Sequence, residues 1–125
     1  MNKLDTYEKV ENYLKKYQSL SYDIILYENK MGGLKAISYS QEEKGTAQDD
    51  MMLVYMEKIE NCREQQKEIE KFIEDNFLGL DRLILHNKYV EGMTYKAIGK
   101  EVGYSTTHVK KLLNRAIYKY IIKNN

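Results

Sequence analysis

The chain has 125 residues and a mass of 14.8 kDa, enough for one domain or two small lobes. Charged residues make up 31% and apolar residues 42%, a balance typical of a soluble, helix-rich protein rather than a disordered one. No apolar run approaches the roughly 18 residues that a membrane span requires, and the first residues contain no hydrophobic signal region. We therefore expect a cytoplasmic protein without a membrane-spanning segment.

The net charge of +1 hides an imbalance along the chain. Residues 81–125 carry nine Lys/Arg and three Asp/Glu, a net charge of +6, whereas residues 1–80 carry eleven and sixteen, a net charge of −5. This asymmetry is expected when only one end of a protein meets nucleic acid.

Residues 1–79 predict a helical region that serves oligomerisation. Asp5 followed by Glu8 resembles a capping box and predicts that the first helix begins there. Apolar residues at helical spacing follow: Tyr7, Val10, Leu14 and Tyr17. A second apolar pattern, "YDIILYENKM", ends at Gly32-Gly33, a natural helix stop. Residues 32–48 hold three glycines and no sustained period, so we expect a flexible connection there.

A long charged helix is predicted next, capped by Asp49 or Asp50 and continuing to Leu78 before Gly79 breaks it. Its coiled-coil-like seam contains Met52, Tyr55, Ile59, Cys62, Gln66, Ile69, Ile73, Asn76 and Leu80. The polar members argue against a strong autonomous zipper. We expect the helix to pack partly on the N-terminal helices and partly on a second copy, as a homodimer, with Cys62 buried in the seam.

Residues 80–125 predict a separate lobe of three shorter helices, which makes the whole chain all-α. Asp81, Thr94 and Ser105 can cap these helices, and Gly92 and Gly103 end the first two.

The stretch "YKAIGKEVGYSTTHVKKL", Tyr95–Leu112, predicts a helix-turn-helix. Its turn needs a positive φ angle, which Gly103 supplies. The close crossing of the two helices needs small residues on the first, and Ala97 and Gly99 lie there. Apolar side chains fall at the inward positions: Ile98, Val102, Tyr104, Val109 and Leu112.

The last helix is predicted to bury one stripe and to present the opposite face to DNA. The expected buried stripe is Val109, Leu112, Ala116, Ile117 and Tyr120. Hydroxyl, ammonium and amide groups that suit base edges are carried by Thr106, Thr107, Lys110, Lys111 and Asn114. Candidates for phosphate contacts are Thr94, Tyr95, Lys96, Ser105, His108, Arg115 and Lys119. We expect double-stranded DNA as the ligand, with no cofactor or metal ion.

The segment "LILHNKYVEGMTYKAIGKEVGYSTTHVKKLLNRAIYKY" resembles region 4 of bacterial sigma factors, with its leading helix, Thr cap, turn glycine and closing "R-A". The order of the upstream segments is similar to that of the phage-encoded regulators of the ArpU/RinA-related family. That resemblance implies a sequence-specific DNA-binding transcription regulator, an activator of late phage or prophage genes. Its implied partners are promoter DNA and host RNA polymerase.

Two other classes of protein share some of these features. A small terminase subunit also combines a helix-turn-helix with oligomerisation helices, although its DNA-binding lobe usually comes first. A module that grips RNA polymerase would also use a basic lobe. An enzyme is disfavoured because His86 and His108 stand alone, without partners at metal-binding or catalytic spacing.

Overall fold

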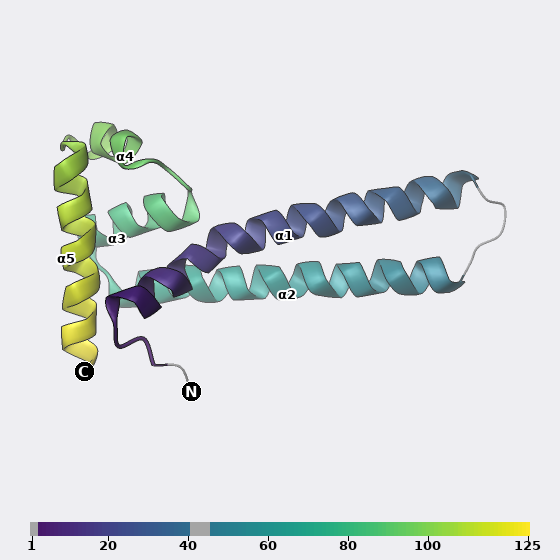
Figure 1. The fold of residues 1–125 in the computed structure, drawn as a ribbon, viewed down its shortest axis with the longest axis horizontal. Coiled ribbons are helices and arrows are strands. Elements are labelled where there is room, and N and C mark those ends of the chain that lie inside the picture. The colour runs from purple at the N-terminus through teal and green to yellow at the C-terminus, as the bar shows by residue number, and fades with distance from the viewer. Residues whose placement is uncertain (1–2, 41–45) are drawn as a thin grey trace. The chain divides into compact units, whose positions relative to one another are not determined.

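A computed structural model describes residues 3–40 and 46–125, and this part of the chain is helical without strands, as predicted (Figure 1). The elements in chain order are α1 Tyr7–Ser40, α2 Thr46–Asn76, α3 Gly79–Leu85, the π-helical turn η1 His86–Val90, α4 Tyr95–Val102 and α5 Thr106–Asn124. Over these residues, no helix has the length and apolar character needed to cross a membrane.

The chain divides into two compact units. The first comprises Met1–Gln18 and Lys67–Asn125, and we call it the helix-turn-helix unit. The second, Ser19–Gln66, is called the hairpin unit. The helices α1 and α2 each contribute to both units, so neither unit is a single stretch of sequence bounded by loops.

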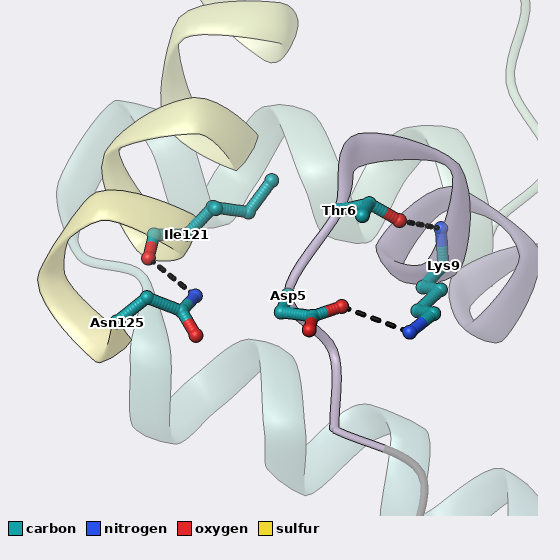
Figure 2. A network of polar contacts seen from close by, with 5 residues as sticks. All are labelled: Asp5, Thr6, Lys9, Ile121 and Asn125. Carbon is teal, nitrogen blue, oxygen red and sulfur yellow. Dashed lines mark hydrogen bonds and ion pairs between the residues drawn. The ribbon is translucent and has the colours of Figure 1, made fainter.

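The first turn of α1 is capped by Thr6, one residue beyond the predicted cap. The Thr6 hydroxyl oxygen accepts a hydrogen bond from the Lys9 backbone N–H at 3.2 Å, while the Asp5 carboxylate pairs with the Lys9 ammonium at 2.9 Å (Figure 2). The predicted capping box of Asp5 and Glu8 is therefore wrong. Thr6 performs the same capping chemistry because its side-chain oxygen satisfies an N–H that has no partner within the helix.

In the hairpin unit, α1 does not stop at the predicted Gly32-Gly33 pair but continues to Ser40. A Cβ added at either glycine would meet open space, so no close contact requires glycine there. Each glycine lowers the stability of the helix by about 1 kcal/mol relative to alanine, and the helix still continues through the pair. The next helix already begins at Thr46, before the predicted caps Asp49 and Asp50. Most of the connection predicted at 32–48 is therefore helical, and its residues 41–45 lie outside the described part.

The two helices of the hairpin unit run side by side in opposite directions (Figure 1). The Gln66 side-chain amide donates to the Ser21 hydroxyl at 2.8 Å, and the rings of Tyr27 and Tyr55 stack with centroids 5.9 Å apart. Cys62 is buried, as predicted, and burial raises the pKa of its thiol. In this unit the α2 seam therefore packs on α1 of the same chain.

The helix-turn-helix unit has an extensive core that draws on both ends of the chain. Its buried apolar side chains are Val10, Leu14, Ile69, Ile73, Phe77, Ile84, Leu85, Tyr89, Ile98, Val109, Leu113, Ala116 and Ile117. On α5, Leu113 is fully buried where Leu112 had been predicted, and Leu112 is half-buried. The core thus includes residues from α1 and α2 as well as from residues 80–125, and the predicted division of the chain between residues 79 and 80 stays a prediction.

The helix predicted to start after Asp81 begins earlier, at Gly79, and ends in the π-helical turn η1. Arg82 donates side-chain hydrogen bonds to the backbone carbonyls of Phe77 at 2.9 Å and Glu74 at 2.8 Å. These bonds satisfy carbonyls at the end of α2, which would otherwise lack partners. The chain then leaves η1 through Gly92, which has a φ of +70°.

Candidate nucleic-acid interface

The turn between α4 and α5 has the predicted glycine geometry. Gly103 adopts the left-handed conformation with a φ of +81°, and its backbone N–H donates to the Gly99 carbonyl at 2.8 Å. Gly99 is the point of closest approach, because a Cβ there would overlap the backbone carbonyl oxygen of Tyr104. A larger residue at Gly99 would separate the two helices of the motif.

Both predicted caps are formed. The Thr94 hydroxyl accepts from the Ala97 N–H at 3.1 Å, and the Ser105 hydroxyl accepts from the His108 N–H at 3.1 Å. Each hydroxyl keeps its own proton, which remains available to a phosphate oxygen. The N-termini of α4 and α5 therefore present hydroxyl donors together with the positive ends of their helix dipoles.

The N-terminal turns of α5 expose the side chains predicted to read bases. Val109 and Leu113 are fully buried and fix the rotation of the helix. The opposite face is exposed along its predicted set: Thr106, Thr107, Lys110, Lys111 and Asn114. A helix with this exposed face has the geometry needed to enter a major groove.

Two lysines make cation–π contacts with the Tyr95 ring beside this face. The ammonium of Lys88 lies 4.1 Å from the ring centroid and that of Lys110 lies 5.3 Å from it. Cation–π attraction holds both charges close to α4 and α5. Lys88 was not among the predicted site residues, because a single lysine in η1 has no distinguishing sequence pattern.

Asn114 is held by a residue from the other end of the chain. Its Oδ1 accepts a hydrogen bond from the Tyr7 hydroxyl at 2.5 Å, and the Tyr7 ring packs against Tyr118 with centroids 5.2 Å apart. Burial, together with the nearby Glu11 carboxylate, raises the pKa of Tyr7 to about 12. Sequence reasoning missed Tyr7 because a contact across 107 positions leaves no local signal.

The remaining predicted phosphate contacts are exposed on α4 and α5: Lys96, His108, Arg115 and Lys119. The His108 ring packs edge-on against Tyr104, with centroids 4.6 Å apart. From residue 94 to the C-terminus the sequence holds seven Lys/Arg and one acidic residue, Glu101. The surface around the motif therefore attracts a polyanion.

The sequence of this motif matches a known family model, Sigma-70, region 4, over residues 80–119. This stretch is similar to sigma region 4. The family match covers less than half of the chain. The searches of curated proteins and of solved structures found no match to this chain. Sigma region 4 is a helical DNA-binding region of transcription regulators and not an enzyme fold. The similarity therefore indicates a DNA-binding regulatory protein.

Proposed function

We propose that the chain is a sequence-specific DNA-binding transcription regulator that inserts α5 into the major groove of a promoter. The observation that carries the proposal is the exposed polar face at the start of α5, set on a glycine-defined turn. Threonine hydroxyls at Thr106 and Thr107 and ammoniums at Lys110 and Lys111 match the acceptors that base edges present.

The phosphate contacts follow from the same placement. The capped N-termini of α4 and α5 supply N–H groups and the hydroxyls of Thr94 and Ser105. Basic side chains on both flanks would anchor the neighbouring phosphates and make binding strongly salt-dependent. Lys88 joins the predicted set because Tyr95 holds it next to Lys110.

For Asn114, the bond to Tyr7 constrains the expected role. Bidentate pairing with adenine needs both the Oδ1 acceptor and the Nδ2 donor of an asparagine. Tyr7 occupies one of the two acceptor positions of Oδ1, so the second acceptor position and the Nδ2 donor remain for a base. Asn114 would then read adenine in the orientation that the Tyr7 hydroxyl holds.

The regulated genes are those of a phage or prophage, and the effect is activation of late genes. This part of the proposal rests on the resemblance of most of the chain to the ArpU/RinA-related regulators, whereas the family match at residues 80–119 supports the DNA-binding regulator alone. Sigma region 4 contacts both DNA and RNA polymerase, so the same lobe serves as the polymerase contact of the activator. The protein acts in the cytoplasm, where host polymerase and phage DNA meet.

Self-association through the hairpin unit completes the regulator as a homodimer. Leu20, Ile59 and Cys62 are the buried apolar side chains among the described residues of this unit. Its exposed large apolar side chains are Tyr22, Ile25, Leu26, Met51, Leu53, Val54 and Met56. A two-helix layer this thin buries too little apolar surface to be stable alone, and a second hairpin would complete a four-helix bundle.

We infer that an open groove in the hairpin unit, with a volume of 420 Å³, is part of the contact surface. Met31, Gly32, Met56 and Ile59 form its apolar part, and the charged residues Glu28, Glu60 and Arg63 line it as well. The exposed fraction of the Met56 side chain is 51%, which is high for an apolar residue beside a seam. Gly32, without a side chain, would let a helix of the second copy approach the α1 backbone closely.

Selection of bound fragments from phage or host genomic DNA tests the proposal. We expect enriched fragments to share a sequence and to lie at promoters. Retention of random fragments only, or of none at low salt, would contradict sequence-specific regulation.

A small terminase-like packaging protein is the second candidate, because it also joins a helix-turn-helix to self-associating helices. Light scattering separates the two, since a dimer supports the regulator and a large closed ring supports the terminase. A pure RNA polymerase-binding module would instead bind polymerase and leave every duplex unbound.

A further inference from the structure

A second groove lies within the helix-turn-helix unit, between the start of α1, the end of α2 and the C-terminal half of α5. It has a volume of 790 Å³. Three aromatic side chains, Tyr13, Phe72 and Tyr120, form its apolar part, and three lysines line it as well: Lys3, Lys9 and Lys16. None of the roles assigned above to DNA or to the second copy uses this groove.

The rings of the groove are packed against one another. Phe72 meets Tyr13 edge-on with centroids 5.2 Å apart and meets Tyr120 edge-on at 5.1 Å. Phe77 approaches Phe72 from within the core at 6.0 Å. Because the rings are half-buried and engaged with each other, the groove offers an apolar floor for aliphatic or aromatic side chains rather than free faces on which bases could stack.

Two of the three lysines lie on α1, and Lys3 precedes it. Lys9 and Lys16 are separated by two turns of α1, about 10 Å along the axis, and Asn12 lies between them on the same face. Asp5 holds the Lys9 ammonium at 2.9 Å (Figure 2), and this contact lowers the pKa of the Asp5 carboxyl. Among the described residues that line the groove itself, none is acidic.

We propose that this groove binds an acidic amphipathic helix of a partner protein. Charge complementarity identifies the occupant: one carboxylate would meet Lys16, and a second, two helical turns away, would share the Lys9 ammonium with Asp5. Apolar side chains between those carboxylates would rest on Phe72 and its neighbouring rings. The amide of Asn12 would fix the register between the two ion pairs.

The groove is distant along α5 from the residues assigned to base reading. Tyr120 follows Thr107 by thirteen positions, a rise of about 20 Å along the helix, and neither Arg115 nor Lys119, which are assigned to phosphates, lines the groove. A partner seated at Tyr120 and DNA seated at Thr107 could therefore be bound at the same time.

The proposal is tested with a fluorescein-labelled synthetic helix of about twenty residues. It carries two glutamates spaced by two turns, with leucine and phenylalanine between them, and a matched peptide carries lysines in place of the glutamates. Fluorescence anisotropy measures binding to the full chain, to Lys9→Glu/Lys16→Glu and to the control Lys67→Glu/Lys71→Glu. The control reverses two exposed charges on α2 of the same unit, outside the groove.

We expect the acidic peptide to bind the wild type and the α2 control alike, and to bind Lys9→Glu/Lys16→Glu at least about tenfold more weakly. The lysine peptide should not bind. Circular dichroism establishes that both variants are folded. Equal peptide binding by all three proteins would overturn the proposal, as would no binding to the wild type. Loss of duplex DNA binding in Lys9→Glu/Lys16→Glu, without any peptide binding, would assign the lysines to DNA instead.

Discussion

The two units of this chain contain parts of the same two helices but bury them differently. In the helix-turn-helix unit, the start of α1 and the end of α2 bury their apolar side chains in a core shared with α3, α4 and α5. In the hairpin unit, the same helices have only each other, and large apolar side chains such as Leu53 and Tyr22 remain exposed. The apolar face of an amphipathic helix is fully buried only where enough other helices pack on it. In the first unit this face is buried and the exposed polar face is left for DNA. In the second unit apolar side chains remain exposed, and we assign them to self-association.

The largest effect is expected from replacing Gly99 with alanine. The added Cβ would overlap the Tyr104 carbonyl, and this contact is with backbone that cannot rotate away. We expect a loss of about 3 kcal/mol or more in the free energy of unfolding of the helix-turn-helix unit. Denaturant unfolding followed by circular dichroism measures it.

Gly103→Ala is the matched control for that experiment. A Cβ at Gly103 meets open space, so only the positive φ is strained, at about 1–2 kcal/mol. Gly103→Val should disrupt the turn further, since branching at Cβ is poorly tolerated at positive φ. Equal stability of the Gly99 and Gly103 alanine variants would show that the two helices do not cross as closely as described.

Charging the exposed face of the hairpin unit should separate the two copies of the protein. In Leu53→Glu/Met56→Glu, two carboxylates would have to be buried in the interface, and we expect the dimer affinity to fall about a hundredfold. Light scattering against concentration measures the affinity. Lys30→Glu, at an exposed polar position of α1, is the control. An unchanged affinity in the double variant, or a monomeric wild type, would remove the role assigned to this unit.

Substitutions on the DNA-facing surface should have separable effects of intermediate size. Lys111→Ala should weaken binding to the preferred sequence by about 1–3 kcal/mol while leaving random duplex almost unaffected. Lys96→Ala should weaken all sequences alike and lower the slope of log affinity against log salt by about 1. Titrations of specific and random duplexes at several salt concentrations provide both quantities. Equal losses on both duplexes for both variants would contradict the division between base and phosphate contacts.

The smallest effect is expected for Tyr7→Phe, which keeps the ring on Tyr118 but removes the hydrogen bond to Asn114. We expect a loss of about 1 kcal/mol in the stability of the helix-turn-helix unit. Tyr13→Phe is a suitable comparison, since its ring also packs at the start of α1. Urea unfolding of the three proteins measures the difference, and identical curves for wild type and Tyr7→Phe would argue against the bond.

The same tyrosine gives a pH dependence with a defined sign. Burial first, and then Glu11, raises the pKa of Tyr7 to about 12 from its usual value of 10.0, so the folded state disfavours the phenolate. The stabilisation from Tyr7 is fully present below pH 10 and is lost as the pH rises through about 12. Burial also raises the pKa values of Tyr13, Tyr17, Tyr89, Tyr95 and Tyr120. The Tyr7 step is therefore measured as the difference in tyrosinate absorbance between wild type and Tyr7→Phe, which we expect to appear near pH 12.

The elements that sequence patterns predicted well are those whose structure is determined locally. The turn at Gly103, the caps at Thr94 and Ser105 and the exposed face of α5 follow from single residues or from helical periodicity. The errors have an equally physical origin. Gly32-Gly33 was predicted to end a helix, but neighbouring residues with good helix propensity carry α1 through it.

Contacts between distant segments could not be predicted. The bond from Tyr7 to Asn114 and the buried positions of Val10 and Leu14 in the helix-turn-helix unit join the two ends of the chain. The choice of Leu113 over Leu112 for the core depends on a rotation of α5 that its packing neighbours set. Periodicity identifies a face to within about one residue and leaves that rotation open.

Site-specific crosslinking from α5 tests the central claim most directly. Thr107→Cys and Lys123→Cys place exposed thiols at opposite ends of α5, and the wild-type Cys62 is buried, so a photoreactive thiol label should attach at the new position. With a duplex selected by the wild-type protein, we expect crosslinks to bases from the label at residue 107 and none from the label at residue 123. Equal crosslinking from both ends, or none from residue 107 to a duplex that the protein retains, would contradict DNA reading by the start of α5.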